Sequence, residues 1–567
     1  MLPVKHLPPN ITSRAPAVLL LAVVGGPLVW SLWGAVMAGL NVSAWQALLL
    51  DPQTVRALCM SLWTGVLASM LSVAITAWLL SRHFPGPGWP RLLRFLSPML
   101  AVPHVAFAIG LAFLIAPSGW LLRALSPWAT GVDAPPPWLT TQDPWGLGLI
   151  AVLVFKEVPF LLWTAATQLQ RAEVAQRWQR ELEVARSLGY HPNAAWWRVL
   201  WPQLWPRLRW PMLAVLAYSL TVVDVALVIG PSTPPTLAVL AWQALLDGDI
   251  ARNAEGAASA WLLAAVLALV ASLFWHISKR PFWRQRWTRG ASKNPKLAAQ
   301  DQPSKQNFSR QTEQRAVSGT GSVALVELLG LYLAVMLTLA LGSVSGIWAF
   351  PALLPQTFTG QAWVSVAGSF STVFTTLTLA LSSALAALVW SVAWLELAPP
   401  IWDRRLRPVL YLPLVLPPVL WVVGLHAMTL TLGQDARWSG VWLAHTLAAV
   451  PYALMALSPA YTGFDPRLRH ITASLGQGHM AFLVRVKWPL LRAALSASLA
   501  IGFAVSVAQY LPTLFIGAGR FATVTTEAVT LASGAQRALT SAYAWLQWLL
   551  PAIVFTLATQ SGKPRSF

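Results

Sequence analysis

Charged residues inside the longest apolar stretches are the first candidates for chemistry in this 567-residue chain. Lys156 and Glu157 lie in FKEVPF, and Asp224 lies in YSLTVVDVALVIG. If these stretches cross a membrane, each charge costs about 2.5–3.5 kcal/mol to insert, so such residues usually serve a function or are paired. Glu157 and Asp224 could line a path for a cation. The alternative is a local or interhelical ion pair with Lys156, or polar packing.

The sequence lacks the motifs that would let the chain carry out hydrolysis itself. It contains no G-x-x-x-x-G-K-[ST], H-E-x-x-H or G-x-S-x-G, and the SGK at 561–563 lacks the upstream glycine. The histidines show no metal-ligand spacing, and we interpret His426 and His445 as packing or pore-lining residues. We therefore predict no catalytic residue, no metal site and no cofactor bound by this chain.

One polar, basic segment, EVARSLGYHPNAAWWRVLWPQLWP at 183–206, contrasts with its apolar surroundings. Residues 171–188 are good helix formers, and Gly189 can adopt the positive φ that ends a helix. Pro192 can begin a second short helix, which we expect Pro202 to end. The pattern predicts two short helices joined by a tight turn.

The second of these short helices carries large apolar side chains beside a positive charge, Trp196 and Trp197 next to Arg198. Exposed apolar and basic groups of this kind suit docking into a groove on another protein. The alternative interpretation is an amphipathic helix that lies on lipid.

The segment recurs 287 residues later as HITASLGQGHMAFLVRVKWPLLRA, at 470–493. The copies share a glycine, an arginine and a proline: Gly189, Arg198 and Pro202 in the first, Gly476, Arg485 and Pro489 in the second. Earlier in each half, PHVAFAIGL at 103–111 resembles PPVLWVVGL at 417–425. The 287-residue offset takes Asp224 to Leu511, so its neighbours Gln509 and Tyr510 join Glu157 and Asp224 as predicted path residues. The pattern indicates duplication with both halves in the same orientation.

The chain is 56% hydrophobic and 10% charged, which is typical of membrane proteins. Continuous apolar stretches approach the ~20 residues that a helix needs to cross the hydrocarbon core. We count twelve, six per half: 17–40, 57–81, 96–116, 147–167, 211–230, 258–277, 323–347, 369–396, 409–430, 441–461, 494–517 and 540–559. They predict an all-α polytopic membrane protein that holds both polar segments at the membrane surface. A signal peptide is the alternative for the first stretch, but that apolar run exceeds a typical signal core.

The net charge of +20 is explained by topology. With the N-terminus inside, the cytoplasmic segments carry 32 Lys and Arg against 7 Asp and Glu, and the external segments carry 6 against 8. Basic residues are retained on the cytoplasmic side, so we predict that both termini are cytoplasmic. We predict lipid as a partner and no nucleic acid.

The basic stretch 279–322 has no apolar period and is predicted to be a solvated cytoplasmic linker. A membrane-surface or nucleic-acid role is the alternative. The linker divides the chain into a first domain, 1–278, and a second, 323–567. Each domain contains about six spans and one polar segment, 183–206 or 470–493.

The two polar segments resemble the cytoplasmic EAA loop of binding-protein-dependent ABC importer permeases. Glu183, Ala185, Gly189 and Pro202 take the family's Glu, second Ala, Gly and Pro positions. In that family the loop forms coupling helices that dock on the ATPase subunits. The resemblance implies two tandem six-helix permease domains of the type I ABC importer fold, fused in one chain.

The second copy departs from the family pattern, because His470 and Thr472 replace the Glu and the Ala. We hypothesise that the two loops couple unequally; drift at a tolerant position is the alternative. The predicted coupling residues are Glu183, Ala185, Gly189, Trp196, Arg198, Pro202, His470, Gly476, Arg485 and Pro489.

The block FIGAGRFATVTTEAVTLASGAQRALTSAYAWLQWLLP at 515–551 resembles thiamine-type double permeases of bacterial inner membranes. The resemblance implies a small solute, thiamine or a related compound, delivered by a periplasmic binding protein and driven by ATP that two copies of a separate ABC ATPase use. Iron(III), sulfate or a polyamine are the alternative substrates. An ATP-independent secondary transporter would also show a 6+6 repeat, but it would not need paired docking loops.

Overall fold

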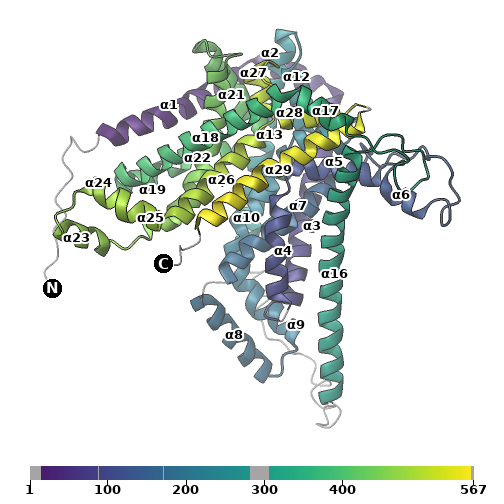
Figure 1. Ribbon diagram of the computed structural model, residues 1–567, viewed down its shortest axis with the longest axis horizontal. Helices are drawn as coiled ribbons and strands as arrows, with labels where there is room; N and C mark the ends of the chain where they lie inside the picture. Colours follow the sequence, from purple (N-terminus) through teal and green to yellow (C-terminus); the bar gives the residue numbers. More distant parts are fainter. Residues whose placement is uncertain (1–14, 87, 170–171, 281–305, 535, 563–567) are drawn as a thin grey trace.

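The computed structural model describes residues 15–86, 88–169, 172–280, 306–534 and 536–562. Helices account for almost all of the regular structure (Figure 1). Among the described residues there is no strand, only an isolated antiparallel bridge between Ser345 and Phe358. The prediction of an all-helical membrane protein is confirmed.

The first half contains the helices up to α13. They are α1 (Ala15–Ala38), α2 (Val42–Leu50), α3 (Pro52–His83), α4 (Trp89–Ala101), α5 (His104–Ile115), α6 (Trp120–Leu125), α7 (Leu147–Leu169), α8 (Ala172–Ser187), α9 (Pro192–Ala195), a π-helical turn (Trp196–Leu200), α10 (Trp201–Thr221), α11 (Asp224–Ile229), α12 (Leu237–Leu245) and α13 (Ile250–Lys279).

The second half begins with α16. Its helices are α16 (Gln306–Ser343), α17 (Gln361–Gly368), α18 (Phe370–Leu397), α19 (Pro400–Leu410), α20 (Leu412–Val415), α21 (Pro418–Thr431), α22 (Trp438–Thr462), α23 (Arg467–Ser474), α24 (His479–Phe482), a π-helical turn (Leu483–Lys487), α25 (Trp488–Leu490), α26 (Arg492–Val507), α27 (Leu511–Gly517), α28 (Val524–Ala532) and α29 (Arg537–Gly562).

Nine of the described helices are long and apolar enough to cross a membrane, and two bent helix pairs raise the number to eleven. The pairs are Pro400–Val415 with Pro418–Thr431, bent by 106°, and His479–Leu490 with Arg492–Val507, bent by 75°. The predicted stretch that these do not include is 211–230. It lies in α10 and α11, whose polar and proline-rich beginning lowers the average hydropathy.

The helical path breaks at equivalent places in the two halves. In the first half α10 ends at Thr221 and α11 begins at Asp224. In the second half α26 ends at Val507 and α27 begins at Leu511. Breaks inside membrane-spanning helices are tolerated where the backbone is buried in protein or lines a cavity, and they often mark the substrate path of a transporter.

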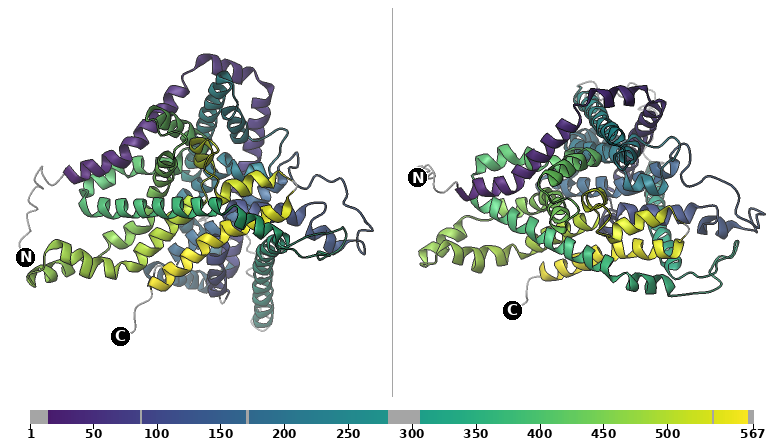
Figure 2. Two further views of the ribbon diagram at one scale, coloured as in Figure 1. Left: turned by 45° about the horizontal axis from the view of Figure 1, so that its top comes forward. Right: turned by 90° about the horizontal axis from the view of Figure 1, so that it is seen from above.

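The first long helix of each half packs against the other half (Figures 1 and 2). Helix α1 runs along α21, and α16 runs along α5. A Cβ built on Gly424 of α21 would lie 2.0 Å from the backbone oxygen of Ser31, and one on Gly110 of α5 would lie 2.6 Å from Val335. These glycines occupy the same place in the repeated motifs at 103–111 and 417–425. The repeated motif therefore contains the glycine against which the first long helix of the other half packs closely.

The segment predicted as a linker, 279–322, is partly helical. Helix α13 ends at Lys279 and α16 begins at Gln306, so the last part of the predicted linker extends the first long helix of the second half. Residues 281–305 lie outside the described residues.

Candidate functional site

The two polar segments have the same backbone path. In the first, α8 ends at a tight turn in which Gly189 has φ of 88°, and the Tyr190 N–H donates to the Ala185 carbonyl at 3.1 Å. In the second, Gly476 has φ of 74°, and the Gln477 N–H donates to the Thr472 carbonyl at 3.2 Å. A positive φ is cheap only for glycine. The predicted glycine turn between two helices is confirmed in both segments.

A π-helical turn follows each glycine turn at positions related by the same offset, Trp196–Leu200 and Leu483–Lys487. We expected Pro202 to end the second short helix, and this expectation is wrong. Pro202 lies in the first turn of α10, where a missing N–H costs little, and the helical path continues from Pro192 to Thr221. Pro489 has the equivalent place in α25.

The exposed surface of these segments differs from the predicted one. Trp196 is only 2% exposed and stacks on Trp201, with ring centroids 5.7 Å apart. It is therefore a packing residue and not part of the exposed surface. Two apolar residues, Val184 of α8 and Leu188 in the turn directly after it, are exposed instead, and Val184 lies next to the exposed Glu183.

The second segment exposes the equivalent apolar pair. Ile471 and Leu475 match Val184 and Leu188 by the 287-residue offset, and Leu188 and Leu475 are 72% and 73% exposed. Arg198 and Arg485 are exposed at matching positions. Ala185 and its counterpart Thr472 are buried. We name the two surfaces, formed by α8–α9 and α23–α24 with their π turns, the coupling surfaces.

The first coupling surface is held by the stacked rings of Trp196 and Trp201 and by the side-chain amide of Gln203. Gln203 of α10 accepts a hydrogen bond from Trp178 Nε1 at 3.0 Å and donates to Glu181 Oε2 at 2.6 Å. Partial burial acts to raise the pKa of Glu181, but hydrogen bonds from Gln203 and Arg177 outweigh it, and the pKa lies below its usual value. The Glu181 carboxylate therefore stays charged and ties α8 to α10.

The second coupling surface is held by an ion pair. Glu396, at the end of α18, accepts hydrogen bonds from Lys487 Nζ and from the Tyr461 hydroxyl, both at 2.7 Å. His479 Nε2 lies 3.3 Å from the other carboxylate oxygen of Glu396. The Lys487 ammonium also lies 3.9 Å from the centroid of the Tyr461 ring. Glu396 is the last residue of the predicted stretch 369–396, and no motif in the sequence indicated these partners.

The structure separates the two neighbouring charges of FKEVPF. Lys156 Nζ donates to the Met99 and Val102 carbonyls, at 3.1 and 2.6 Å. Glu157 faces elsewhere, and its Oε1 lies 3.3 Å from His104 Nε2. Consecutive residues of a helix do not face each other, so the predicted local ion pair with Lys156 is not formed.

Glu157 belongs to a polar group drawn from both halves, which we name the inter-half cluster. The His104 and Tyr218 ring centroids are 4.7 Å apart. The cluster consists of His104, Glu157, Tyr218 and Asp224 from the first half and Tyr452 and Tyr510 from the second. Of the predicted path residues it includes Glu157, Asp224 and Tyr510. Gln509 instead donates to the Val505 carbonyl of its own helix, at 3.2 Å.

The two histidines singled out in the sequence have different surroundings. His445 is buried between Ser506 Oγ and Thr513 Oγ1, both at 2.8 Å, as a packing residue would be. His426 Nε2 lies 3.4 Å from Asp435. In the part of the chain that the structure describes, no three His, Cys, Asp or Glu residues are placed to hold a metal ion.

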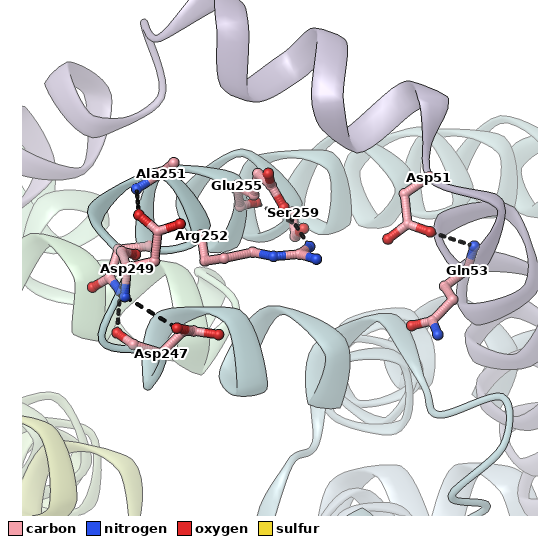
Figure 3. A network of polar contacts seen from close by, with 9 residues as sticks. Asp51, Gln53, Asp247, Asp249, Ala251, Arg252, Glu255 and Ser259 are labelled. Atoms are coloured by element: carbon pink, nitrogen blue, oxygen red, sulfur yellow. Dashed lines mark hydrogen bonds and ion pairs between the residues drawn. The ribbon is translucent and has the colours of Figure 1, made fainter.

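A cavity of about 650 Å³ lies between α2, α3, α12 and α13, at the edge of the molecule away from α8 and α9 (Figure 1). Asp51, which lines the cavity, and Asp249, at the start of α13, accept hydrogen bonds from N–H groups in the first turns of α3 and α13. Arg252 pairs with Glu255 at 2.8 Å (Figure 3). The carboxylates of Asp51 and Asp249 therefore act as helix caps.

No protein-family model matches the chain. It is 34% identical over 552 residues to the inner membrane ABC transporter permease protein YnjC of Escherichia coli strain K12, which covers 96% of this chain and 95% of the relative. The chain belongs to the ABC transporter permeases. It is therefore the membrane component of a transporter and a multi-pass inner-membrane protein.

Shorter stretches match permeases whose names state a substrate. The molybdenum transport system permease protein ModB of Haemophilus influenzae is 26% identical over 23% of this chain and 66% of its own length. The sulfate transport system permease protein CysT of Synechococcus elongatus is 28% identical over 26% of this chain and 46% of its own length. This permease thus shares local sequence with relatives that are named for different solutes.

Proposed function

We propose that this permease is the membrane-spanning subunit of an importer, in which both permease domains are fused and a separate ATPase supplies the energy. The coupling surfaces carry the proposal. They repeat the same glycine turn, π turn, exposed apolar pair and exposed arginine at one constant offset. Two equivalent surfaces suit two equivalent ATPase subunits.

The helical path explains how movement of the ATPase could reach the substrate. From Pro192 to Thr221 the chain is helical without interruption, through α9, the π turn and α10. A displacement of the first coupling surface is therefore transmitted along α10 to the break before Asp224. Rocking of the two halves about their interface would then open the path to one side at a time.

The charge distribution supports an orientation of the chain in the membrane. Because basic residues are retained on the cytoplasmic side, the basic segments favour a cytoplasmic location for the coupling surfaces and both termini. The opposite face then receives a solute from a periplasmic binding protein. Thiamine or a related compound is the solute that the resemblance at 515–551 suggests, and iron(III), sulfate and polyamines are the alternatives.

The coupling surfaces are tested by changing their exposed leucines. Leu188→Asp with Leu475→Asp should abolish co-purification of the ATPase from native membranes, because both side chains are largely exposed and the folded chain loses little. Leu354→Asp is the matched control, since Leu354 is 54% exposed in the loop between α16 and α17. Unchanged recovery of the ATPase with the double variant would contradict the proposed docking.

The energy source is tested with vesicles. Proteoliposomes containing the permease and its co-purified ATPase should take up labelled thiamine with ATP and not without it, and should do so only when the binding protein is present. Accumulation of solute by the permease alone would favour an ATP-independent secondary transporter.

A further inference from the structure

The inter-half cluster lies where the two broken spans meet. Asp224 is the first residue of α11, directly after the break at Val222–Val223, and Tyr510 precedes α27 after the equivalent break. The Asp224 carboxylate is close enough to interact electrostatically with His104, Tyr218 and Tyr510. The cluster therefore joins both halves at the place where a solute would pass between them.

Side chains of the cluster are accessible to solvent. Tyr452 and the side chain of His104 are each 36% exposed, and Asp224 is partly exposed. These groups are available to a small ligand.

The cluster contains two carboxylates and one basic side chain, His104, whose Nε2 lies 3.3 Å from Glu157 Oε1. The nearby Lys156 directs its ammonium at the Met99 and Val102 carbonyls. Asp224 Oδ1 accepts a hydrogen bond from the Val225 N–H at 3.0 Å, and within the described residues no side chain donates to Asp224. Two carboxylates at membrane depth are costly, and a passing cation would offset that cost.

The same arrangement disfavours an anion. In broken transporter helices the positive N-terminal end of a half-helix can face an anionic group of the substrate. Here Asp224 fills that end of α11 with its own carboxylate. An oxyanion in the cluster would meet Asp224 and Glu157 instead of helix N–H groups.

The tyrosines add the second feature of a cation site. Tyr218 comes from α10, Tyr452 from α22 and Tyr510 from the break before α27, and Tyr218 and Tyr510 lie close enough to Asp224 to interact with it electrostatically. Aromatic faces attract cations, and they bind organic ammonium groups especially well because those groups are weakly hydrated. Carboxylates supply the charge, and aromatic rings supply a surface that fits an organic cation better than a hydrated metal ion.

We propose that the inter-half cluster is a binding site on the translocation path for a small organic cation, with Glu157 and Asp224 as the charge-selecting residues. The proposal rests on the proposed function, because it places the site on an import path. It distinguishes this permease from relatives named for sulfate or molybdenum. It predicts that oxyanions are excluded at the cluster.

Charge-selective labelling of a cysteine in the cluster tests the proposal. The chain has one cysteine, Cys59, so a Cys59→Ser background carrying Tyr452→Cys provides a single thiol. The purified permease in nanodiscs is treated with trimethylammonium-bearing or sulfonate-bearing methanethiosulfonate. The ratio of the two rates is normalised to that of Leu139→Cys, because Leu139 is 70% exposed in the loop between α6 and α7.

The expected ratio follows from Coulomb's law. At about 6 Å with water-like screening, one carboxylate changes the ratio of cationic to anionic labelling about tenfold. The normalised ratio should therefore be about 100, and Asp224→Asn or Glu157→Gln should each lower it about tenfold. Asp435→Asn is the matched control, because Asp435 also lies beside a histidine but outside the cluster. Tetramethylammonium should slow labelling, and sulfate should not.

The proposal is overturned if the normalised ratio is near one, or if the two neutralised variants leave it unchanged. Absence of any labelling at both Tyr452→Cys and Tyr218→Cys would also overturn it, since the cluster would then be closed to solvent. Tyr218→Cys replaces Tyr452→Cys where that variant does not fold. Labelling needs no ATPase, so a failure of ATP-driven uptake would count against the proposed function and leave the charge selectivity standing.

Discussion

The ion pair between Glu396 and Lys487, which holds the second coupling surface, can be tested by neutralising Glu396. Glu396 and Lys487 form a pair whose side chains are 14% and 12% exposed, and Tyr461 donates to the same carboxylate oxygen. Glu396→Gln keeps the size and an acceptor oxygen but removes the charge. The Lys487 ammonium then remains in a mostly buried place without its counter-charge.

The expected loss lies between two limits. Exposed ion pairs contribute about 0–1 kcal/mol, and removing one partner of a fully buried pair costs about 3–5 kcal/mol. With about one eighth of each side chain exposed, and with the Tyr461 ring still beside the ammonium, we expect a loss of about 2–3 kcal/mol. At 1.4 kcal/mol per factor of ten, this makes local release of the second surface about 30- to 100-fold more frequent.

Hydrogen exchange measures that local release directly. In nanodiscs, the amide hydrogens of peptides covering 476–490 should exchange about 30- to 100-fold faster in Glu396→Gln than in the wild type. Peptides of α22 that are N-terminal to Tyr461 should keep their protection. In proteoliposomes with the ATPase, the solute transported per ATP hydrolysed should fall. The matched control is Glu181→Gln, because the Glu181 side chain is 30% exposed and should contribute no more than about 1 kcal/mol.

Exchanging the two charges distinguishes loss of the ion pair from general destabilisation of the fold. Glu396→Lys combined with Lys487→Glu restores opposite charges, so the double variant should be closer to wild type than either single change. Equal exchange rates in wild type and Glu396→Gln, or a double variant no better than the single ones, would refute the reasoning.

Two further predictions concern the interface of the halves and the asymmetry of the loops. Gly424→Ala should destabilise the purified chain by about 1–3 kcal/mol in thermal unfolding, because the new methyl group meets the Ser31 backbone oxygen; Gly330→Ala, with no atom within 4 Å of the added Cβ, should be neutral or slightly stabilising. Glu183→Ala should reduce transport-coupled ATP hydrolysis more than His470→Ala, and equal losses would argue against unequal coupling.

Local features could be predicted from the sequence where the backbone alone decides them. The turns at Gly189 and Gly476 could be predicted because glycine readily adopts the positive φ that such a turn requires. The length of the apolar stretches could be predicted because the thickness of the membrane sets it. The prediction for Trp196 failed because composition does not say which face of a short helix packs inward. Its neighbour Trp201, which stacks on it, was the available signal.

Contacts between distant segments could not be predicted in this way. Glu396 and Lys487 are 91 residues apart and show no shared motif. The Lys156–Glu157 pair, by contrast, could have been rejected from the sequence, since adjacent helical residues point in directions about 100° apart. Asp224 was selected as a charge within an apolar stretch, and the repeat led from it to Tyr510, because breaks in both halves fall at matching positions.

Fusion of the two halves explains why they perform one task with different chemistry. Lys487 of the second coupling surface corresponds to Leu200 in the first, which is a buried apolar residue. Asp224 corresponds to Leu511. In a symmetric dimer every residue appears twice, so a carboxylate at the interface would bring its copy. In a fused chain each half always meets the other, and a single Asp224 can supply negative charge to a shared path without a second carboxylate opposite it.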